Sequence, residues 1–207
     1  MLLWYGHKDT EHSPSENGPQ VSLMNAALTG HAPQTPTIIV MGVSGCGKST
    51  VAALIASKLG ATFLDADDLH PKANIDQMAA GTPLTDAQRE PWLRRVRDVA
   101  KQHGQRNEHT GRMLVIACSA LKKQYREILN GAPSVQYVFL SGSKELIKSR
   151  LRLRHGHFMP ESLLDSQIAA LESPLGEPHV VQVDVDATPD EVANEAIRLL
   201  RQIDCIA

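Results

Sequence analysis

The stretch Gly42-Val-Ser-Gly-Cys-Gly-Lys-Ser49 decides the fold, because it fits the pattern G-x-x-x-x-G-K-[ST] in full. A short apolar run, Thr37–Met41, comes directly before it and predicts a buried strand. A helical segment follows from about Ser49 to Leu59 and is closed by Gly60, a residue type typical of helix C-termini. A strand, a glycine-rich turn and a helix in this order predict a phosphate-binding loop.

The residue types of this loop match the chemistry of a nucleotide triphosphate. Gly42, Gly45 and Gly47 let the backbone curl so that successive N–H groups point at a phosphate, and the helix N-terminus adds partial positive charge. Lys48 is expected to reach the β and γ phosphates, and the Ser49 hydroxyl is expected to ligate Mg²⁺. The loop therefore predicts a nucleotide-binding protein.

Composition and charge exclude several other classes of protein. The chain has 207 residues, of which 42% are hydrophobic, and its 21 basic and 23 acidic side chains give a net charge of −2. This length fits one globular domain, and the lack of a basic excess argues against sequence-independent binding to nucleic acid. The longest apolar runs, such as Met113–Cys118, have the length of a strand, whereas a membrane span needs about 20 residues.

The three cysteines, Cys46, Cys118 and Cys205, are widely spaced and form no C-x-x-C pair. An odd number without zinc-site spacing indicates reduced thiols, and since the N-terminus carries no export signal we expect a cytoplasmic protein. Cys46 lies inside the phosphate-binding loop, where backbone N–H groups could lower its pKa and make it redox-sensitive. The simpler interpretation is that Cys46 is a small filler residue.

The character of the sequence changes near residue 35. Residues 1–35 carry scattered Gly, Pro, Ser and His and end in a proline-containing linker, so we expect a dispensable N-terminal arm. Over residues 36–207, short β-rich runs alternate with longer helical segments, which predicts one three-layer α/β domain with a parallel sheet. Besides the strand before the loop, the predicted strands are Thr62–Leu64, Met113–Cys118, Val135–Leu140 and His179–Val185.

Helix starts are indicated by capping patterns. Thr85 and Thr188 are each followed three residues later by Gln or Glu, which predicts a capping box and a helix at both places. Ser119 follows the third predicted strand and is expected to cap another helix. A basic helix is expected over about residues 143–154.

The rest of the sequence favours a kinase over a GTPase-type switch. The chain contains neither the Asp-x-x-Gly that senses a γ-phosphate nor the Asn-Lys-x-Asp that reads guanine. Instead, Asp65 and Asp67 follow the second predicted strand, at the edge where ligands of open α/β sheets bind. By strand alternation both carboxylates should face one crevice, one holding water on Mg²⁺ and the other accepting the proton of an attacking hydroxyl. A helix-capping role is the alternative for Asp67.

A cluster of basic side chains follows the fourth predicted strand: Lys144, Lys148, Arg150, Arg152 and Arg154. Arg150 and Arg154 are four residues apart on one helix face and could clamp a triphosphate; a solvated basic helix is the alternative. The adjacent His155-Gly-His157-Phe158 is expected to form a mobile lid, because two histidines without a third ligand make a poor metal site.

Several further sequence motifs follow the phosphate-binding loop: Phe63-Leu-Asp-Ala-Asp67, Leu69-His-Pro71, Gly81-Thr-Pro-Leu84, Pro91-Trp-Leu93, Cys118-Ser-Ala-Leu-Lys-Lys123 with Tyr125-Arg126, and Gly156-His-Phe158. In this order, and together with the phosphate-binding loop, they resemble the gluconokinase family over about residues 37–186. The resemblance implies a fold like that of shikimate and nucleoside monophosphate kinases, with strand order 2-3-1-4-5, helices on both faces and a lid at about residues 150–165. It also implies a homodimer.

The resemblance further implies transfer of the ATP γ-phosphate to the 6-hydroxyl of D-gluconate, with Mg²⁺, to give 6-phospho-D-gluconate and ADP. The nucleotide-binding residues that it implies are Gly42, Val43, Ser44, Gly45, Cys46, Gly47, Lys48, Ser49, Thr50, Arg150 and Pro189, the last two on opposite faces of adenine. The expected catalytic residues are Lys48, Asp67 and Arg154, and the expected metal ligands are Ser49 and Asp65. The expected substrate-binding residues are Asp67, His70, Lys122, Arg126 and His157.

Two other interpretations of the function stay open. The chain could be a kinase for another small hydroxy acid or a nucleotide on the same scaffold, or a nucleotide-dependent regulator without transfer activity. Structural roles also stay open for two substrate residues, since His70 could cap the segment before Pro71 and Lys122 could be a surface residue at a helix start.

Overall fold

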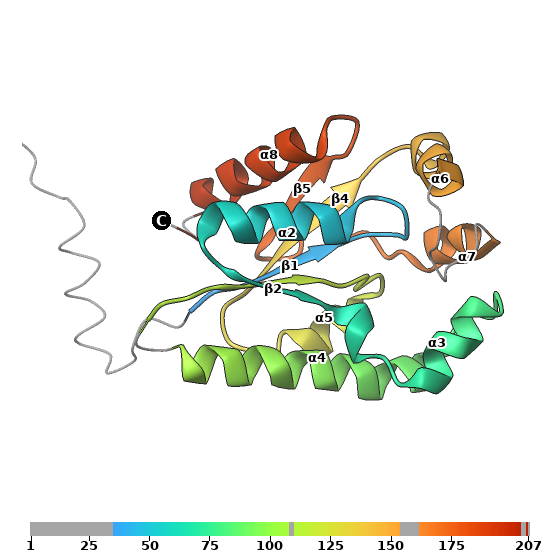
Figure 1. The fold of residues 1–207 in the computed structure, drawn as a ribbon, viewed down its shortest axis with the longest axis horizontal. Helices are drawn as coiled ribbons and strands as arrows, with labels where there is room; N and C mark the ends of the chain where they lie inside the picture. The colour runs from blue at the N-terminus through green and yellow to red at the C-terminus, as the bar shows by residue number, and fades with distance from the viewer. Residues whose placement is uncertain (1–34, 108–109, 154–161, 204–205, 207) are drawn as a thin grey trace, which may run out of the picture. The chain divides into compact units, whose positions relative to one another are not determined.

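The centre of the fold is a five-stranded sheet in the order β2-β3-β1-β4-β5 (Figure 1). The structure is a computed structural model that describes residues 35–107, 110–153, 162–203 and 206. The strands are β1 (Thr37–Met41), β2 (Thr62–Asp65), β3 (Leu114–Ala117), β4 (Val135–Ser141) and β5 (Val180–Asp184). Every neighbouring pair is parallel, so the predicted strand order is confirmed and the carboxyl ends of the strands share one edge.

The central strand β1 is buried along its whole length. Its Ile39 lies in register with Ile116 of β3 on one side and with Tyr137 of β4 on the other. A strand with neighbours on both sides and helices on both faces has no solvent-facing positions, which explains why Ile38–Met41 is apolar throughout instead of alternating. The phosphate-binding loop therefore leaves the sheet at its most rigid place.

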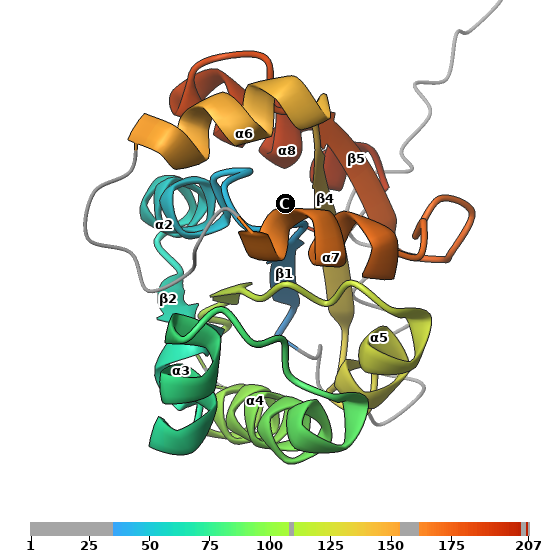
Figure 2. The same cartoon turned by 90° about the vertical axis from the view of Figure 1, so that its right-hand side faces the viewer.

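Helices cover both faces of the sheet. They are α2 (Lys48–Leu59), α3 (Lys72–Ala79), α4 (Asp86–Arg106), α5 (Lys123–Leu129), α6 (Lys144–Leu153), α7 (Ser162–Ala170) and α8 (Pro189–Gln202), with the 3₁₀ helix η1 (Ala66–Leu69) after β2. Figures 1 and 2 show α2 and α8 on one face and α4 and α5 on the other. Alternate residues of β1 serve the two cores, so that Ile38 packs in the core with Ile55 of α2 and Ile39 in the core with Leu93 of α4.

Both predicted capping boxes are present. At the start of α4 the Thr85 hydroxyl accepts the backbone N–H of Gln88, and the Gln88 side chain accepts the N–H of Thr85. Thr188 and Glu191 make the same reciprocal pair before α8, which begins with Pro189. Each pair satisfies N–H groups that a helix start leaves without partners, and such local chemistry can be read from sequence.

The prediction that Ser119 caps a helix is wrong. The helix α5 begins only at Lys123, and residues 118–121 form a loop in which Ala120 has a positive φ of 44°. The Ser119 carbonyl accepts the N–H of Gly42 at 3.3 Å, so this segment packs against the phosphate-binding loop instead of starting a helix. Helix α7 has no counterpart among the predicted elements.

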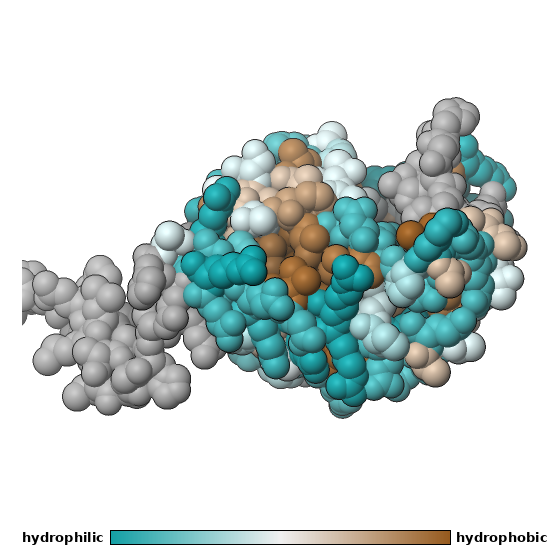
Figure 3. Space-filling view, turned by 60° about the horizontal axis from the view of Figure 1, so that its bottom comes forward, coloured by the Kyte–Doolittle hydropathy of each residue, from teal (hydrophilic) through white to brown (hydrophobic). Residues whose placement is uncertain are grey.

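The surface is mixed in character. On the face shown in Figure 3, hydrophilic side chains surround a smaller hydrophobic area. The large apolar side chains that are exposed in the described part of the chain are Phe63, Leu175 and Ile203. Among the described helices, none has the length and apolar composition required to cross a membrane.

Candidate functional site

The phosphate-binding loop connects β1 to α2 and depends on its glycines. Gly42, Gly45 and Gly47 have φ values of 141°, 85° and 98°, in the region that side chains rarely adopt. A Cβ atom on Gly42 would lie 2.8 Å from the carbonyl oxygen of Leu140, and one on Gly45 would lie 2.6 Å from the Leu151 side chain of α6. Both the backbone conformation and the close neighbours therefore require glycine here.

Lys48 lies at the first turn of α2 and points back over the loop. Its ammonium Nζ donates to the carbonyl oxygen of Val43 at 3.0 Å. This bond holds the positive charge beside the backbone N–H groups of the loop, where a phosphate would meet both. The geometry suits a lysine that neutralises the charge of β and γ phosphates.

Ser49 and Asp65, the two predicted metal ligands, meet in the structure. The Ser49 hydroxyl donates to the carboxylate Oδ2 of Asp65 at 2.6 Å, joining the start of α2 to the end of β2. Hydroxyl and carboxylate oxygens are hard donors of the kind that Mg²⁺ prefers, and Mg²⁺ in such sites keeps waters and phosphate oxygens as its other ligands. The pair fits this ion, although no group of three or more His, Cys, Asp or Glu side chains gathers in the described residues.

The structure places Asp67 next to Asp65, but not by the strand alternation that the sequence predicts. It lies in η1, past the end of β2, so strand alternation does not position it. Its backbone N–H donates to Oδ1 of Asp65 at 3.1 Å, which folds the chain back toward the strand end. Burial raises the pKa of the neighbouring Cys118 thiol to about 12, and the charges of Asp67, Lys48 and Asp65 all act on that thiol. All three charged groups are therefore close enough to Cys118, which follows β3, to influence its thiol.

His70 ends the same segment and is almost fully buried. Its ring stacks on Trp92 of α4, with the centroids 4.1 Å apart and the planes at 13°, while the Trp92 indole N–H donates to the Ala66 carbonyl at 2.7 Å. Burial, with a contribution from Arg89, lowers the pKa of His70 to about 4, so the ring is neutral near pH 7. Its buried Nδ1 has no hydrogen-bond partner among the described residues. A neutral imidazole suits a hydroxyl of a ligand better than a carboxylate.

A cavity of about 260 Å³ lies beside the loop and brings together Arg150 and Pro189, the residues expected around adenine. Its other lining residues are Cys46, Gly47, Thr50, Val51, Val185, Ala187 and Val192. The Arg150 guanidinium is held by the Val185 carbonyl, to which it donates at 2.6 Å. A planar cation facing a proline across an apolar cavity can take a flat aromatic base between them.

Cys46 in the loop is a buried filler. Its side chain is 1% exposed, and burial raises the pKa of its thiol. The alternative of a lowered pKa and a redox-sensitive thiol is therefore wrong in direction, because desolvation outweighs the nearby N–H groups and Lys48.

Comparisons with known proteins show the family of the chain. A family model described as an AAA domain matches residues 38–174. The thermosensitive gluconokinase of Escherichia coli (strain K12) is 45% identical over 171 residues, which cover 80% of this chain and 89% of that protein. The gluconokinase of Gluconobacter oxydans (strain 621H) is 44% identical over 78% of this chain and 89% of its own. The chain belongs to the gluconokinase family.

Solved structures place the fold in the same family. A crystal structure of a gluconokinase from Sinorhizobium meliloti 1021 has a TM-score of 0.72 at 41% identity, covering 82% of this chain and 93% of that one. An APS kinase from Mycobacterium tuberculosis, at 24% identity and a TM-score of 0.58, shares the fold. This gluconokinase-family chain is therefore built on the scaffold of P-loop small-molecule kinases.

Lys122, expected at the substrate, is engaged elsewhere in this gluconokinase-family structure. Its ammonium donates to both carboxylate oxygens of Asp86 at 2.8 Å. Hydrogen bonds from Lys122, Tyr125 and Gln124 together lower the pKa of Asp86 to about 2. The contacts of Lys122 thus match the alternative of a structural lysine at the start of α5.

Arg126, also expected at the substrate, is 1% exposed. Its five N–H groups donate to five acceptors: both carboxylate oxygens of Glu177 and the carbonyls of Ala120, Leu121 and Glu172. Arginine has five such donors in all, so each one is used inside the protein. The structure therefore gives Arg126 the contacts of a residue that fastens the 118–121 loop.

The remaining predicted residues, Arg154 and His157, lie outside the described residues, as does most of the expected lid. One residue that sequence reasoning missed is Gln167 of α7, whose side-chain oxygen accepts the N–H of Ser44 in the loop at 2.6 Å. No pattern marks this glutamine in the sequence, because its partner lies 123 residues away.

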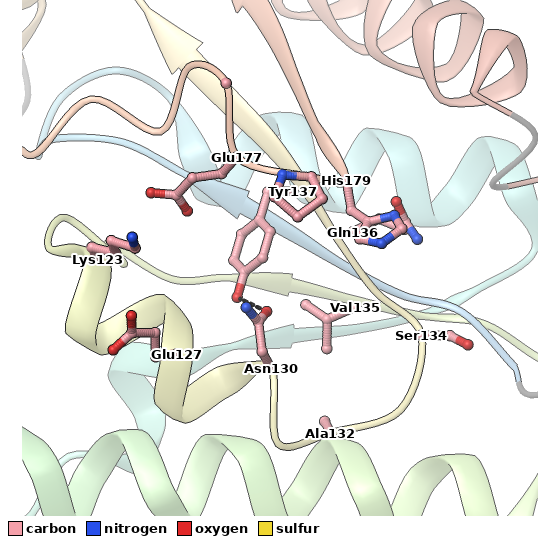
Figure 4. A pocket seen from close by; sticks show the side chains of 12 residues that line it. Lys123, Glu127, Asn130, Ala132, Ser134, Val135, Gln136, Tyr137, Glu177 and His179 are labelled. Carbon is pink, nitrogen blue, oxygen red and sulfur yellow. Dashed lines mark hydrogen bonds between the residues drawn. The ribbon is translucent and has the colours of Figure 1, made fainter.

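A second cavity, of about 620 Å³, lies at the amino ends of β4 and β5 (Figure 4). It is lined by Lys123, Glu127, Asn130, Ala132, Ser134, Val135, Gln136, Tyr137, Gly176, Glu177, Pro178 and His179. Figure 4 shows the Tyr137 hydroxyl meeting Asn130, to which it donates at 2.8 Å. The phosphate-binding loop follows the carboxyl end of β1, so the smaller cavity beside it and this second cavity lie at opposite ends of the parallel strands.

Proposed function

We propose that the protein transfers the γ-phosphoryl group of ATP to the 6-hydroxyl of D-gluconate, giving 6-phospho-D-gluconate and ADP. One observation carries the proposal: the Asp65 carboxylate accepts both the Ser49 hydroxyl and the Asp67 N–H, and Lys48 directly precedes Ser49 at the start of α2. This is the set of groups that phosphoryl transfer requires, in a chain of the gluconokinase family.

On the nucleotide side, adenine would lie between Arg150 and Pro189, and the phosphates along the N–H groups of the loop. Ser49, and Asp65 through water, would hold Mg²⁺, which when bound neutralises charge on the β and γ phosphates. Lys48, held by its bond to the Val43 carbonyl, would contact the same phosphates with its other N–H donors. Arg154 keeps its proposed role in offsetting charge on the transferred group.

On the acceptor side, Asp67 would orient the C6 hydroxyl and take its proton as the new bond to phosphorus forms. His70, neutral and stacked on Trp92, would hydrogen-bond a hydroxyl of the sugar acid. His157 keeps its proposed contact with substrate, whereas the contacts of Lys122 and Arg126 favour structural roles. We further propose a homodimer that works in the cytoplasm.

The test is a coupled assay of ADP release with Mg-ATP and a panel of acceptors. The panel contains D-gluconate, other sugar acids, shikimate and nucleoside monophosphates. We expect turnover with gluconate well above that with the rest, and phosphorus NMR of the product should place the phosphate on C6. Turnover only with another acceptor would reassign the substrate, and tight nucleotide binding without turnover would indicate a regulator.

A further inference from the structure

The peptide unit between Val43 and Ser44 is held at both of its ends. Its carbonyl oxygen accepts the Lys48 ammonium at 3.0 Å, and its N–H donates to Oε1 of Gln167 at 2.6 Å. In a trans peptide the C=O and N–H point in opposite directions, so the two side chains hold this unit from opposite sides. The two bonds also polarise each other, which strengthens both.

The bond to Gln167 is shielded from water. Gln167 is 7% exposed and Ser44 is 8% exposed, and one turn earlier on α7 the Leu164 side chain is buried in the core at 2%. A buried N–H has no water to replace a lost acceptor, so losing the bond to the glutamine is costly. On the other side of the peptide, the Val43 oxygen also accepts the Cys46 N–H at 3.4 Å. Leu164 lies in the core and Ile168 packs against it, so α7 is attached to the core on both sides of Gln167.

We propose that Gln167 is a positioning residue for the triphosphate: through Ser44 it fixes the peptide whose carbonyl sets the position of the Lys48 ammonium. Its carboxamide provides an acceptor without charge. A carboxylate in the same place would accept the same N–H but would repel the phosphates that Lys48 attracts. Since Lys48 reaches the β and γ phosphates, the repulsion would act on ATP more than on ADP.

The experiment compares three variants of the full chain by calorimetric titration with Mg-ATP and Mg-ADP. Gln167→Glu keeps the acceptor and adds charge, whereas Gln167→Leu keeps the apolar stem and removes the acceptor. Ala169→Glu is the matched control, because Ala169 is an exposed position of the same helix. Thermal unfolding of each variant shows whether the fold is retained.

We expect Gln167→Glu to raise the Kd for ATP by about tenfold or more, with a smaller effect on ADP, while Ala169→Glu leaves both unchanged. Gln167→Leu should raise the Kd for both nucleotides. If the glutamate variant does not fold, the leucine variant alone tests the proposal. Wild-type Kd values in Gln167→Glu and Gln167→Leu, with only a lower Tm, would overturn the proposal. So would an equal loss of ATP affinity in Ala169→Glu. The inference rests on the nucleotide site of the proposed function, but a chain that binds ATP without phosphorylating gluconate would still test it.

Discussion

Asp65 and Asp67 are two residues apart, yet their surroundings give them different tasks. The Asp65 carboxylate accepts the Ser49 hydroxyl with one oxygen and the Asp67 N–H with the other, so it is fixed next to the proposed metal. Asp67 lies in the first turn of η1, two residues past the end of the strand. A metal-side carboxylate needs a fixed position, whereas a proton acceptor must meet an arriving hydroxyl.

Replacing Asp67 by Asn should abolish proton transfer while leaving nucleotide binding intact. Asn keeps the size of the side chain but cannot accept a proton, so we expect kcat to fall by about 10²- to 10⁴-fold. The Kd for ATP should not change. Steady-state kinetics and direct titration measure the two quantities, and Asp68→Asn at the exposed neighbouring position is the control. A variant with the kcat of the wild type would remove Asp67 from the mechanism.

His70 predicts a component of stability that depends on pH. The pKa of a histidine in an unfolded chain is about 6.5. Burial, together with Arg89, lowers the pKa of folded His70 to about 4. Between these values the unfolded state binds more protons than the folded state, so the free energy of unfolding falls as the pH is lowered through this window. The stabilising contribution is complete above about pH 6.5.

The variant His70→Phe tests this dependence, because a phenyl ring can keep the stacking on Trp92 but cannot titrate. Urea unfolding at about pH 7, 6 and 5 should show a smaller loss of stability in the variant than in the wild type. If the two proteins lose stability in parallel, His70 does not have a depressed pKa. The variant should also raise KM for the acceptor if His70 binds a hydroxyl of the substrate.

At the scale of elements, Arg126 joins three segments that are distant in sequence. From α5 it bonds the loop after β3 through Ala120 and Leu121, and the segment before β5 through Glu172 and Glu177. It also holds the pKa of Glu177 below its usual range. The loop that it fastens contacts the phosphate-binding loop through the carbonyl of Ser119. Arg126 is therefore connected to the phosphate-binding loop through this segment.

Arg126→Met should destabilise the protein without a specific effect on the acceptor. Removing one partner of a buried ion pair leaves the other partner uncompensated, and we expect the free energy of unfolding to fall by about 3–5 kcal/mol. Glu177→Gln breaks the same pair from its more exposed side, and should cost less. Chemical denaturation measures both. An Arg126→Lys variant with wild-type stability and a raised KM for gluconate would instead support the substrate role predicted from sequence.

At the scale of the whole molecule, the sequence predicts well what depends on neighbours along the chain. The phosphate-binding loop, its strand and helix, and the capping boxes at Thr85 and Thr188 are local patterns, and the structure contains all of them. The strand order follows from the family resemblance, because it reflects a topology shared by relatives. The fold class could therefore be predicted without coordinates, whereas the roles of Ser49 and Asp65 as metal ligands stay a prediction.

Contacts between distant segments could not be predicted from the sequence. The family resemblance implies a substrate-binding role for Arg126, and nothing in the sequence indicates its ion pair with Glu177, 51 residues later in the chain. Gln167 gains its role only when α7 packs against the loop. The segment from Asp65 to Asp67 was expected to continue as a strand, but the Asp65 side chain accepts the Asp67 N–H and turns the chain into η1. In each case tertiary or local hydrogen bonds override the pattern.

The division of the chain yields the last prediction. Contacts separate Met1–Pro33 from Gln34–Ala207, and every described helix and strand belongs to the second unit. A chain that starts at Gln34 keeps the buried Thr35 and all of β1, so we expect it to fold with an unchanged Tm and an unchanged kcat for gluconate. A chain that starts at Ile39 is the matched control, because it loses Thr37 and Ile38 of the five-residue central strand and should not fold. Thermal unfolding and the ADP-release assay compare both with the full chain, and a loss of kcat in the longer truncated chain would show that the first unit takes part in catalysis.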